Sequence, residues 1–156
     1  MFYEEVFRKL NERAVKYAVT GGLALVLHGV VRLTADLDLF VELSGENLEK
    51  FWGAMEELGF MPRVPITKEI LLNPAERDRL FREKNMVMMS LYHPADLIKQ
   101  VDFFIKEPVP FGELEIEWKK AKDIEIPVVS KNTLIRLKRM AGRPQDLKDI
   151  EMLEKL

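Results

Sequence analysis

The chain has 156 residues, 47% of them hydrophobic, which is enough for one domain with an apolar core. Its 24 basic and 26 acidic residues nearly cancel, so its overall charge does not indicate a nucleic-acid or membrane binder. The absence of cysteine excludes disulfides, thiolate catalysis and cysteine-ligated zinc. Because the sequence shows no signal segment and no apolar run of ~18 residues, we expect one cytoplasmic domain over residues 1–156.

Helices and strands are both predicted along the chain. Hydrophobic periodicity predicts helices over residues 3–16, 23–30, 44–58, 76–84, 111–120, 130–141 and 144–156. Strands are predicted over residues 17–20, 36–42, 86–92, 99–105 and 124–129. Residues 61–75 contain three prolines and are expected to be mostly irregular. The order predicts an α/β (or α+β) fold, in which helices flank a small mixed sheet and the carboxyl-terminal third, from about residue 130, is helical.

The helix expected over residues 111–120 rests on conflicting signals. Leu114, Ile116 and Trp118 alternate as they would in a strand, whereas the glutamate and leucine content of the segment favours a helix. We expect the helix.

Two aspartates, Asp36 and Asp38, lie within an otherwise apolar run that is predicted as a strand. Alternate side chains of a strand share a face, so both carboxylates point the same way, with Cα atoms about 6.6 Å apart. Leu37 and Leu39 are expected to face the core. Adjacent anions repel each other unless a cation lies between them. Mg²⁺ prefers oxygen ligands and is often held by one or two carboxylates together with substrate phosphates.

A glycine pair, Gly21-Gly22, ends the first predicted strand and leads into a helix. Free backbone N–H groups at such a helix start suit a phosphate, and glycine lacks the Cβ that would keep the phosphate away. Arg32 and Thr34 come just before the aspartate strand, on the side where that phosphate would lie. Glycine pairs and Asp-x-Asp are each common by chance, but their order and spacing together favour a site for nucleotide and metal.

A third acid, Asp102, lies among apolar residues in the strand predicted over 99–105. A solvent-facing aspartate on an edge strand would give the same pattern. If this strand is adjacent to that of Asp36 and Asp38, the three carboxylates can hold two Mg²⁺ ions. Two such ions, ~3.5–4 Å apart, would stabilise the attacking and leaving oxygens of a displacement at phosphorus. Asp102 could also accept the proton of the attacking hydroxyl.

The order and spacing of several residues resemble the pattern of the nucleotidyltransferase superfamily of the DNA polymerase β type. These residues are Gly21, Gly22, Arg32, Thr34, Asp36, Asp38 and Asp102. Within that superfamily, the chain is most similar to small prokaryotic members related to abortive-infection toxin nucleotidyltransferases. The resemblance implies that the glycine pair contacts the triphosphate, that the paired aspartates bind metal and that Asp102 is the third acid. Many members have Gly-Ser at the turn, whereas Gly22 leaves only backbone donors.

Lys138 falls inside the apolar half of the helix predicted over residues 130–141. Its side chain could extend to the surface or reach a phosphate, and the resemblance favours the phosphate because the toxin-like branch often has a basic residue here. Asp146, near the start of the last helix, suits the helix dipole. The resemblance also implies a functional role for Asp146.

We therefore expect an Mg²⁺-dependent enzyme that transfers a nucleoside monophosphate from a nucleoside triphosphate to an acceptor hydroxyl. The alternative is a non-catalytic module of the same fold that acts as a regulatory or toxin–antitoxin partner. The sequence leaves the acceptor open among a transfer-RNA end, a protein side chain and a small molecule. It also leaves open an antitoxin partner or a homodimer.

Overall fold

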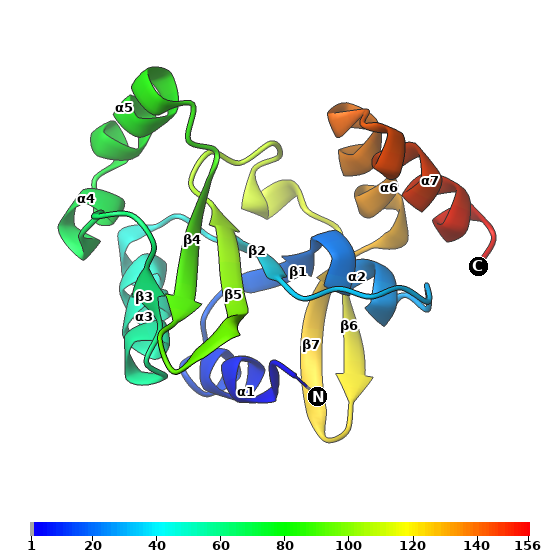
Figure 1. Ribbon diagram of the computed structural model, residues 1–156, viewed down its shortest axis with the longest axis horizontal. Coiled ribbons are helices and arrows are strands. Elements are labelled where there is room, and N and C mark those ends of the chain that lie inside the picture. The colour runs from blue at the N-terminus through cyan, green and yellow to red at the C-terminus, as the bar shows by residue number, and fades with distance from the viewer. Residues whose placement is uncertain (1) are drawn as a thin grey trace.

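A seven-stranded mixed sheet runs through the molecule in the order β3-β4-β5-β2-β1-β7-β6 (Figure 1). The strands are β1 (Tyr17–Thr20), β2 (Leu37–Val41), β3 (Met61–Pro62), β4 (Met88–His93), β5 (Asp96–Phe104), β6 (Ile116–Ala121) and β7 (Ile124–Val129). The helices are α1 (Glu4–Glu12), α2 (Gly21–Leu27), α3 (Gly45–Glu57), α4 (Lys68–Leu72), α5 (Pro74–Lys84), α6 (Lys131–Ala141) and α7 (Pro144–Glu154), with a 3-10 turn, η1 (Phe111–Glu113). This computed structural model describes residues 2–156, in which no helix is long and apolar enough to cross a membrane.

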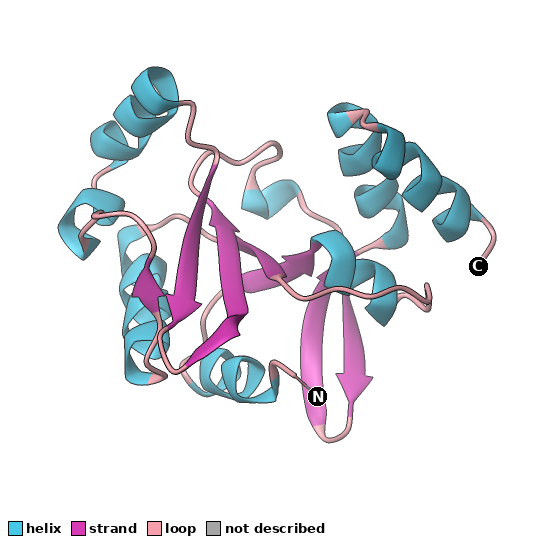
Figure 2. Ribbon diagram, viewed as in Figure 1, coloured by secondary structure: helices cyan, strands magenta, loops and turns pink. Residues whose placement is uncertain are grey.

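The centre of the sheet joins strands that are far apart in the chain. Strand β2 pairs antiparallel with β1 and parallel with β5, while β1 pairs parallel with β7. Helices surround this sheet, as Figure 2 shows. The predicted α/β class with a mixed sheet is therefore confirmed.

The face of the sheet that carries Leu37 and Leu39 holds the apolar core. Both leucines are fully buried, as the alternation in β2 predicts. Helix α3 covers this face through Phe51, whose ring centroid lies 4.9 Å from that of Phe103 on β5. Burying each such side chain stabilises the fold by roughly 1.5–3 kcal/mol. Because successive residues of a strand alternate in direction, Asp38 is left on the opposite face.

The carboxyl-terminal helices α6 and α7 form a hairpin beside the sheet (Figure 1). The Ser130 hydroxyl caps α6 by accepting the Thr133 N–H at 3.1 Å, and Gly142 ends the helix in the left-handed conformation, with φ 63°. Pro144 opens α7. The start signals and the stop signal predicted for this part of the chain are confirmed.

Residues 111–120 do not form the predicted helix. They form η1 and most of β6, whose Ile116 and Trp118 pair with Val129 and Pro127 of β7. The strand alternation decides the structure here because β7 provides an edge to pair with, which helix propensity alone does not take into account.

Several smaller expectations also differ from the structure, and helix α1 ends at Glu12 rather than at residue 16. Helix α2 begins at Gly21 rather than residue 23 and ends before residue 30, since the glycine pair forms its first turn. The segment 61–75, expected to be mostly irregular, contains β3 and α4, and Thr67 caps α4 by accepting the Ile70 N–H at 3.3 Å. Helix α5 begins at Pro74, not residue 76, because Asn73 caps it.

Candidate active site

The structure brings Asp36, Asp38 and Asp102 together. In the parallel pairing of β2 with β5, Asp38 lies directly beside Asp102, and Asp36 immediately precedes β2. Burial first, and then the neighbouring Asp102 and Asp36 carboxylates, together raise the pKa of Asp38 to about 7. Partial burial and the Asp102 charge also raise the pKa of Asp36. The three acids thus share one local electrostatic environment.

The chemistry of these side chains fits a hard divalent cation. The Asp102 charge raises the pKa of both Asp36 and Asp38, and a cation between these carboxylates would relieve that repulsion. Within residues 2–156, no three acidic or histidine side chains are already arranged closely enough to hold an ion. A cation would therefore have to draw the three carboxylates closer together.

The glycine pair packs against the candidate ligands. Gly21 has φ +66°, and a Cβ at this position would clash with the Asp38 carboxylate. A Cβ on Gly22 would lie 2.6 Å from Thr34 Oγ1. In the structure the glycines make room for Asp38 and Thr34, and their contact with a phosphate stays a prediction.

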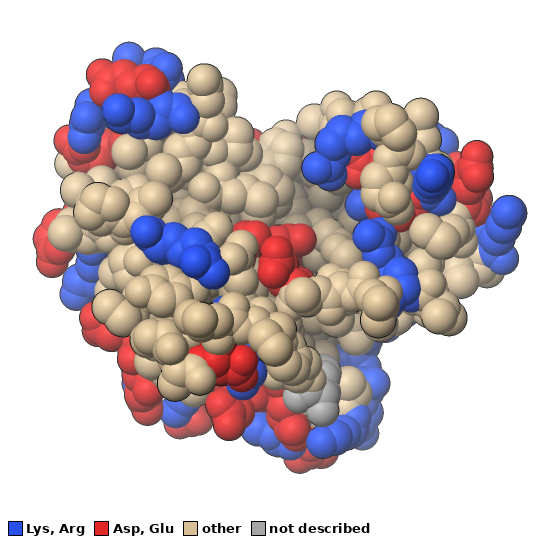
Figure 3. All heavy atoms as spheres, viewed as in Figure 1, with Lys and Arg blue, Asp and Glu red and all other residues tan. Residues whose placement is uncertain are grey.

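Figure 3 shows a hollow on this face of the molecule, with a group of acidic atoms near its centre. The hollow separates the part that carries α4 and α5 from the part that carries α6 and α7 (Figures 1 and 3). A cavity of about 180 Å³ at this place is lined by Gly21 and Asp38, by Phe104 of β5, and by Lys138 and Arg143. Asp146 also lines it, so the cavity combines two carboxylates, an aromatic wall and two cations.

Buried aspartates of α7 hold the basic side chains of this region. Asp146 and Asp149 are each 1% exposed. Lys138 Nζ lies 2.9 Å from Asp149 Oδ2 and 3.5 Å from Asp146 Oδ1, and Arg32 Nη1 lies 2.8 Å from Asp149 Oδ1. Arg143 Nε lies 2.7 Å from Asp146 Oδ2. The predicted phosphate ligands Arg32 and Lys138 are thus paired within the protein, beside the carboxylates.

Asp149 and Arg143 were not predicted from the sequence. A signal was available, because Asp146 and Asp149 lie three residues apart on the face of α7 that also buries Ile150 and Leu153. Two acids on a buried helix face require cationic partners, and the sequence does not show which cations these are.

On the other side of the carboxylates, a chain of polar contacts leads to Asp102. Gln100 Nε2 donates to Asp102 Oδ1 at 3.0 Å and to Oδ2 at 3.3 Å, and Gln100 Oε1 accepts from Arg63 Nε at 2.9 Å. The guanidinium of Arg63 lies 5.0 Å from the centroid of the Tyr92 ring. Arginine can only donate, so it fixes the amide with its nitrogen toward Asp102. Gln100 and Asp102 share a strand face, but no sequence signal singled out Gln100.

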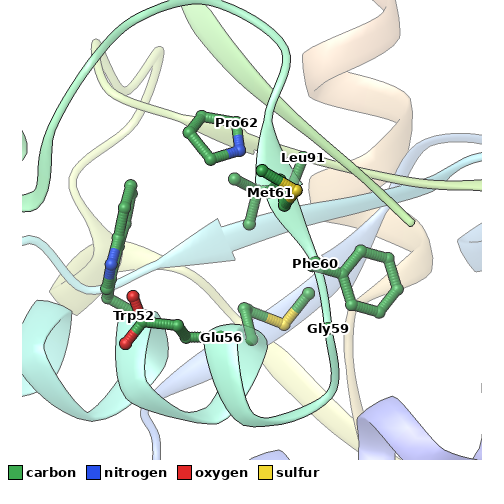
Figure 4. A pocket seen from close by; sticks show the side chains of 8 residues that line it. Trp52, Glu56, Gly59, Phe60, Met61, Pro62 and Leu91 are labelled. Atoms are coloured by element: carbon green, nitrogen blue, oxygen red, sulfur yellow. The ribbon is translucent and has the colours of Figure 1, made fainter. Parts of the chain in front are cut away.

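A more apolar pocket lies away from the carboxylates. This cavity of about 380 Å³ lies between α3, β3 and β4, where Trp52, Met61 and Leu91 line it (Figure 4). Glu56 is its one charged lining residue in the described part of the chain. It contains none of the three predicted acids, so its position does not suit the expected chemistry.

No protein-family model and no curated protein sequence gives a significant match to this chain. Solved structures do share its fold. The lincosamide antibiotic adenylyltransferase LnuA, bound to lincomycin, is 18% identical with a TM-score of 0.62, over 97% of this chain and 95% of that one. A protein of Thermotoga maritima thought to be a nucleotidyltransferase is 16% identical with a TM-score of 0.62, over 99% and 89% of the two chains.

The complex of ANT(2")-Ia with adenylyl-2"-tobramycin is 13% identical, with a TM-score of 0.60, over 97% of this chain and 85% of that one. These similarities extend over nearly the whole chain. The chain thus has a nucleotidyltransferase-like fold.

Proposed function

We propose that the protein is a nucleotidyltransferase that moves a nucleoside monophosphate from a nucleoside triphosphate to an acceptor hydroxyl. The observation that carries this proposal is the register that places Asp38 beside Asp102, with Asp36 next to them, in a hollow that also contains Lys138 and Arg143. The fold likeness to antibiotic adenylyltransferases supports the same reaction class. Kinship with the toxin-like branch remains a prediction.

Asp36, Asp38 and Asp102 are the residues that would hold two Mg²⁺ ions. When bound, the ions would neutralise the phosphate charge and stabilise the attacking and leaving oxygens. Gln100 keeps the Asp102 carboxylate oriented, and each carboxylate oxygen has two lone pairs, so this amide leaves positions free for other partners.

The other predicted site residues would bind the triphosphate. The backbone N–H groups of Gly21 and Gly22 lie at the start of α2, beside the carboxylates, where the partial positive charge of a helix start favours anions. Thr34 lies where a Cβ on Gly22 would fall, and Asp149 holds the cations Arg32 and Lys138. Their charge would attract the phosphates.

In the proposed reaction, the acceptor oxygen forms a bond to the α-phosphorus. The bond from that phosphorus to the oxygen that bridges to the β-phosphate breaks, and pyrophosphate leaves. Asp102 accepts the proton of the acceptor hydroxyl. Atoms and charge are then accounted for without a further reactant.

The test is labelling with α-³²P nucleoside triphosphates and Mg²⁺, with transfer RNA, cellular protein and small hydroxyl compounds offered as separate acceptors. We expect one acceptor pool to be labelled by the wild type and not by Asp36→Asn. Equal labelling by both proteins would overturn the assignment. The assignment would also be overturned if no acceptor were labelled and calorimetry detected no heat at millimolar triphosphate. That result would favour the non-catalytic module.

A further inference from the structure

Arg77 of α5 is a buried cation, 9% exposed, that has no carboxylate within 4.0 Å in the described chain. Its Nη1 donates to the Leu71 carbonyl at 2.5 Å and its Nη2 to the Leu43 carbonyl at 3.4 Å. Burial lowers the pKa of Arg77 from its ordinary value. A buried charge is costly unless a charge of opposite sign compensates it, and two carbonyl dipoles compensate it only in part.

Arg77 lines a cavity of about 250 Å³ that contains a second cation. The cavity lies between α5, the loop after β2 and the segment that follows β5, and Lys106 and Glu107 also line it. Lys106 Nζ lies 5.0 Å from the centroid of the Phe81 ring and, within residues 2–156, has no carboxylate in ion-pair contact. Two cations without an ion-pair partner therefore border one small cavity.

The acidic groups around the cavity are otherwise engaged. Asp78 accepts from Arg82 Nε at 2.7 Å. Glu107 accepts the Phe111 N–H at 3.0 Å, and burial raises the pKa of its carboxyl group. Glu42 adds a further negative charge near Glu107. Glu107 is thus the nearest candidate partner for Arg77, yet it does not form an ion pair with it.

We propose that this cavity binds a small oxyanion, a phosphate or carboxylate group, between Arg77 and Lys106. The planar guanidinium fork of Arg77 suits two oxygens of such an anion, and the Lys106 ammonium adds a point charge. The site is separate from the carboxylate cluster, because Leu43 follows the end of β2 whereas Asp38 lies at its beginning (Figure 1). It does not depend on the proposed function.

The test is isothermal titration of the full chain with inorganic phosphate and, separately, acetate, in chloride buffer of equal ionic strength. Binding of either anion by the wild type is expected, and the stronger one identifies the preferred oxyanion. Lys106→Met and Arg77→Met should each weaken binding at least tenfold, whereas Lys84→Met, also on α5 but outside the cavity lining, should not change it. Because Lys106 is exposed, its variant tests the site even if Arg77→Met does not fold.

Glu107→Gln distinguishes binding of an added oxyanion from an ion pair between Arg77 and Glu107. If the cavity binds an oxyanion, removing the Glu107 charge should tighten binding, because a repulsive neighbour is lost. The proposal is overturned if the wild type binds neither anion, if Lys106→Met binds as the wild type does, or if Glu107→Gln weakens binding. Loss of binding in Asp38→Asn would also overturn it, by placing the anion in the carboxylate hollow.

Discussion

Lys138 Nζ lies 2.9 Å from Asp149 Oδ2, and this ion pair connects α6 to α7 beside the candidate active site. Lys138 is 11% exposed and Asp149 is 1% exposed at the side chain, so both charges are largely removed from water. Asp149 also holds Arg32 at 2.8 Å. One buried carboxylate therefore fixes two cations that come from segments far apart in the sequence.

Replacing Asp149 should destabilise the protein strongly. Asp149→Leu would leave Lys138 and Arg32 without their shared carboxylate, and breaking a buried pair costs roughly 3–5 kcal/mol. Chemical denaturation monitored by circular dichroism measures the free energy of unfolding. Glu154→Leu is the control, because Glu154 lies on α7 like Asp149 but forms an exposed ion pair with Arg139. This substitution should change the free energy of unfolding by about 1 kcal/mol or less. Equal losses in the two variants would contradict the prediction.

Asp146 should make stability depend on acid pH. The Arg143 side chain lowers the pKa of Asp146 to about 2, below its ordinary value of 3.8. A lowered pKa in the folded state stabilises the protein above the ordinary pKa, and this stability is lost as pH falls toward about 2. The difference in unfolding free energy between wild type and Asp146→Asn should therefore shrink from pH 6 to pH 3. Urea titrations at several pH values test this, and a difference that is independent of pH would refute it.

Gly21→Ala should destabilise the folded protein through strain beside the carboxylates. The substitution places a Cβ in the left-handed region, at a cost of about 1–2 kcal/mol, and it also drives a methyl group into the Asp38 carboxylate. Thermal unfolding should show the loss. Gly45→Ala is the control, since a Cβ there meets no atom within 4 Å and no positive φ is involved. A Gly21→Ala protein as stable as this control would show that the site tolerates the methyl group.

Gln100→Leu should weaken binding of a divalent cation. The amide orients the Asp102 carboxylate, and removing such a supporting hydrogen bond typically costs about 10–100-fold in metal affinity. Mn²⁺ titration followed by electron paramagnetic resonance provides the measurement. Tyr92→Phe is the control, because it keeps the ring beneath Arg63. Unchanged Mn²⁺ affinity in Gln100→Leu would mean that Asp102 does not need this partner or does not ligate.

The grouping of the three candidate acids was predictable only in part from local patterns. Asp36 and Asp38 stand out as charges inside an apolar strand, and the two-residue period of that strand already placed them on one face. The position of Asp102 was conditional on strand order, and the parallel pairing of β2 with β5 satisfied that condition. For residues 111–120, in contrast, local signals conflicted and the edge of β7 decided the outcome.

By itself, the sequence determined the mixed α/β class, the glycine turn and the acids that face away from the core, because periodicity and turn chemistry act over a few neighbouring residues. Only the tertiary structure decided which charges meet. Lys138 pairs with Asp149, Gln100 orients Asp102, and Arg77 is buried beside a cavity. These contacts arise where separate elements pack together, and a linear pattern carries no information about which side chains that packing brings within bonding distance.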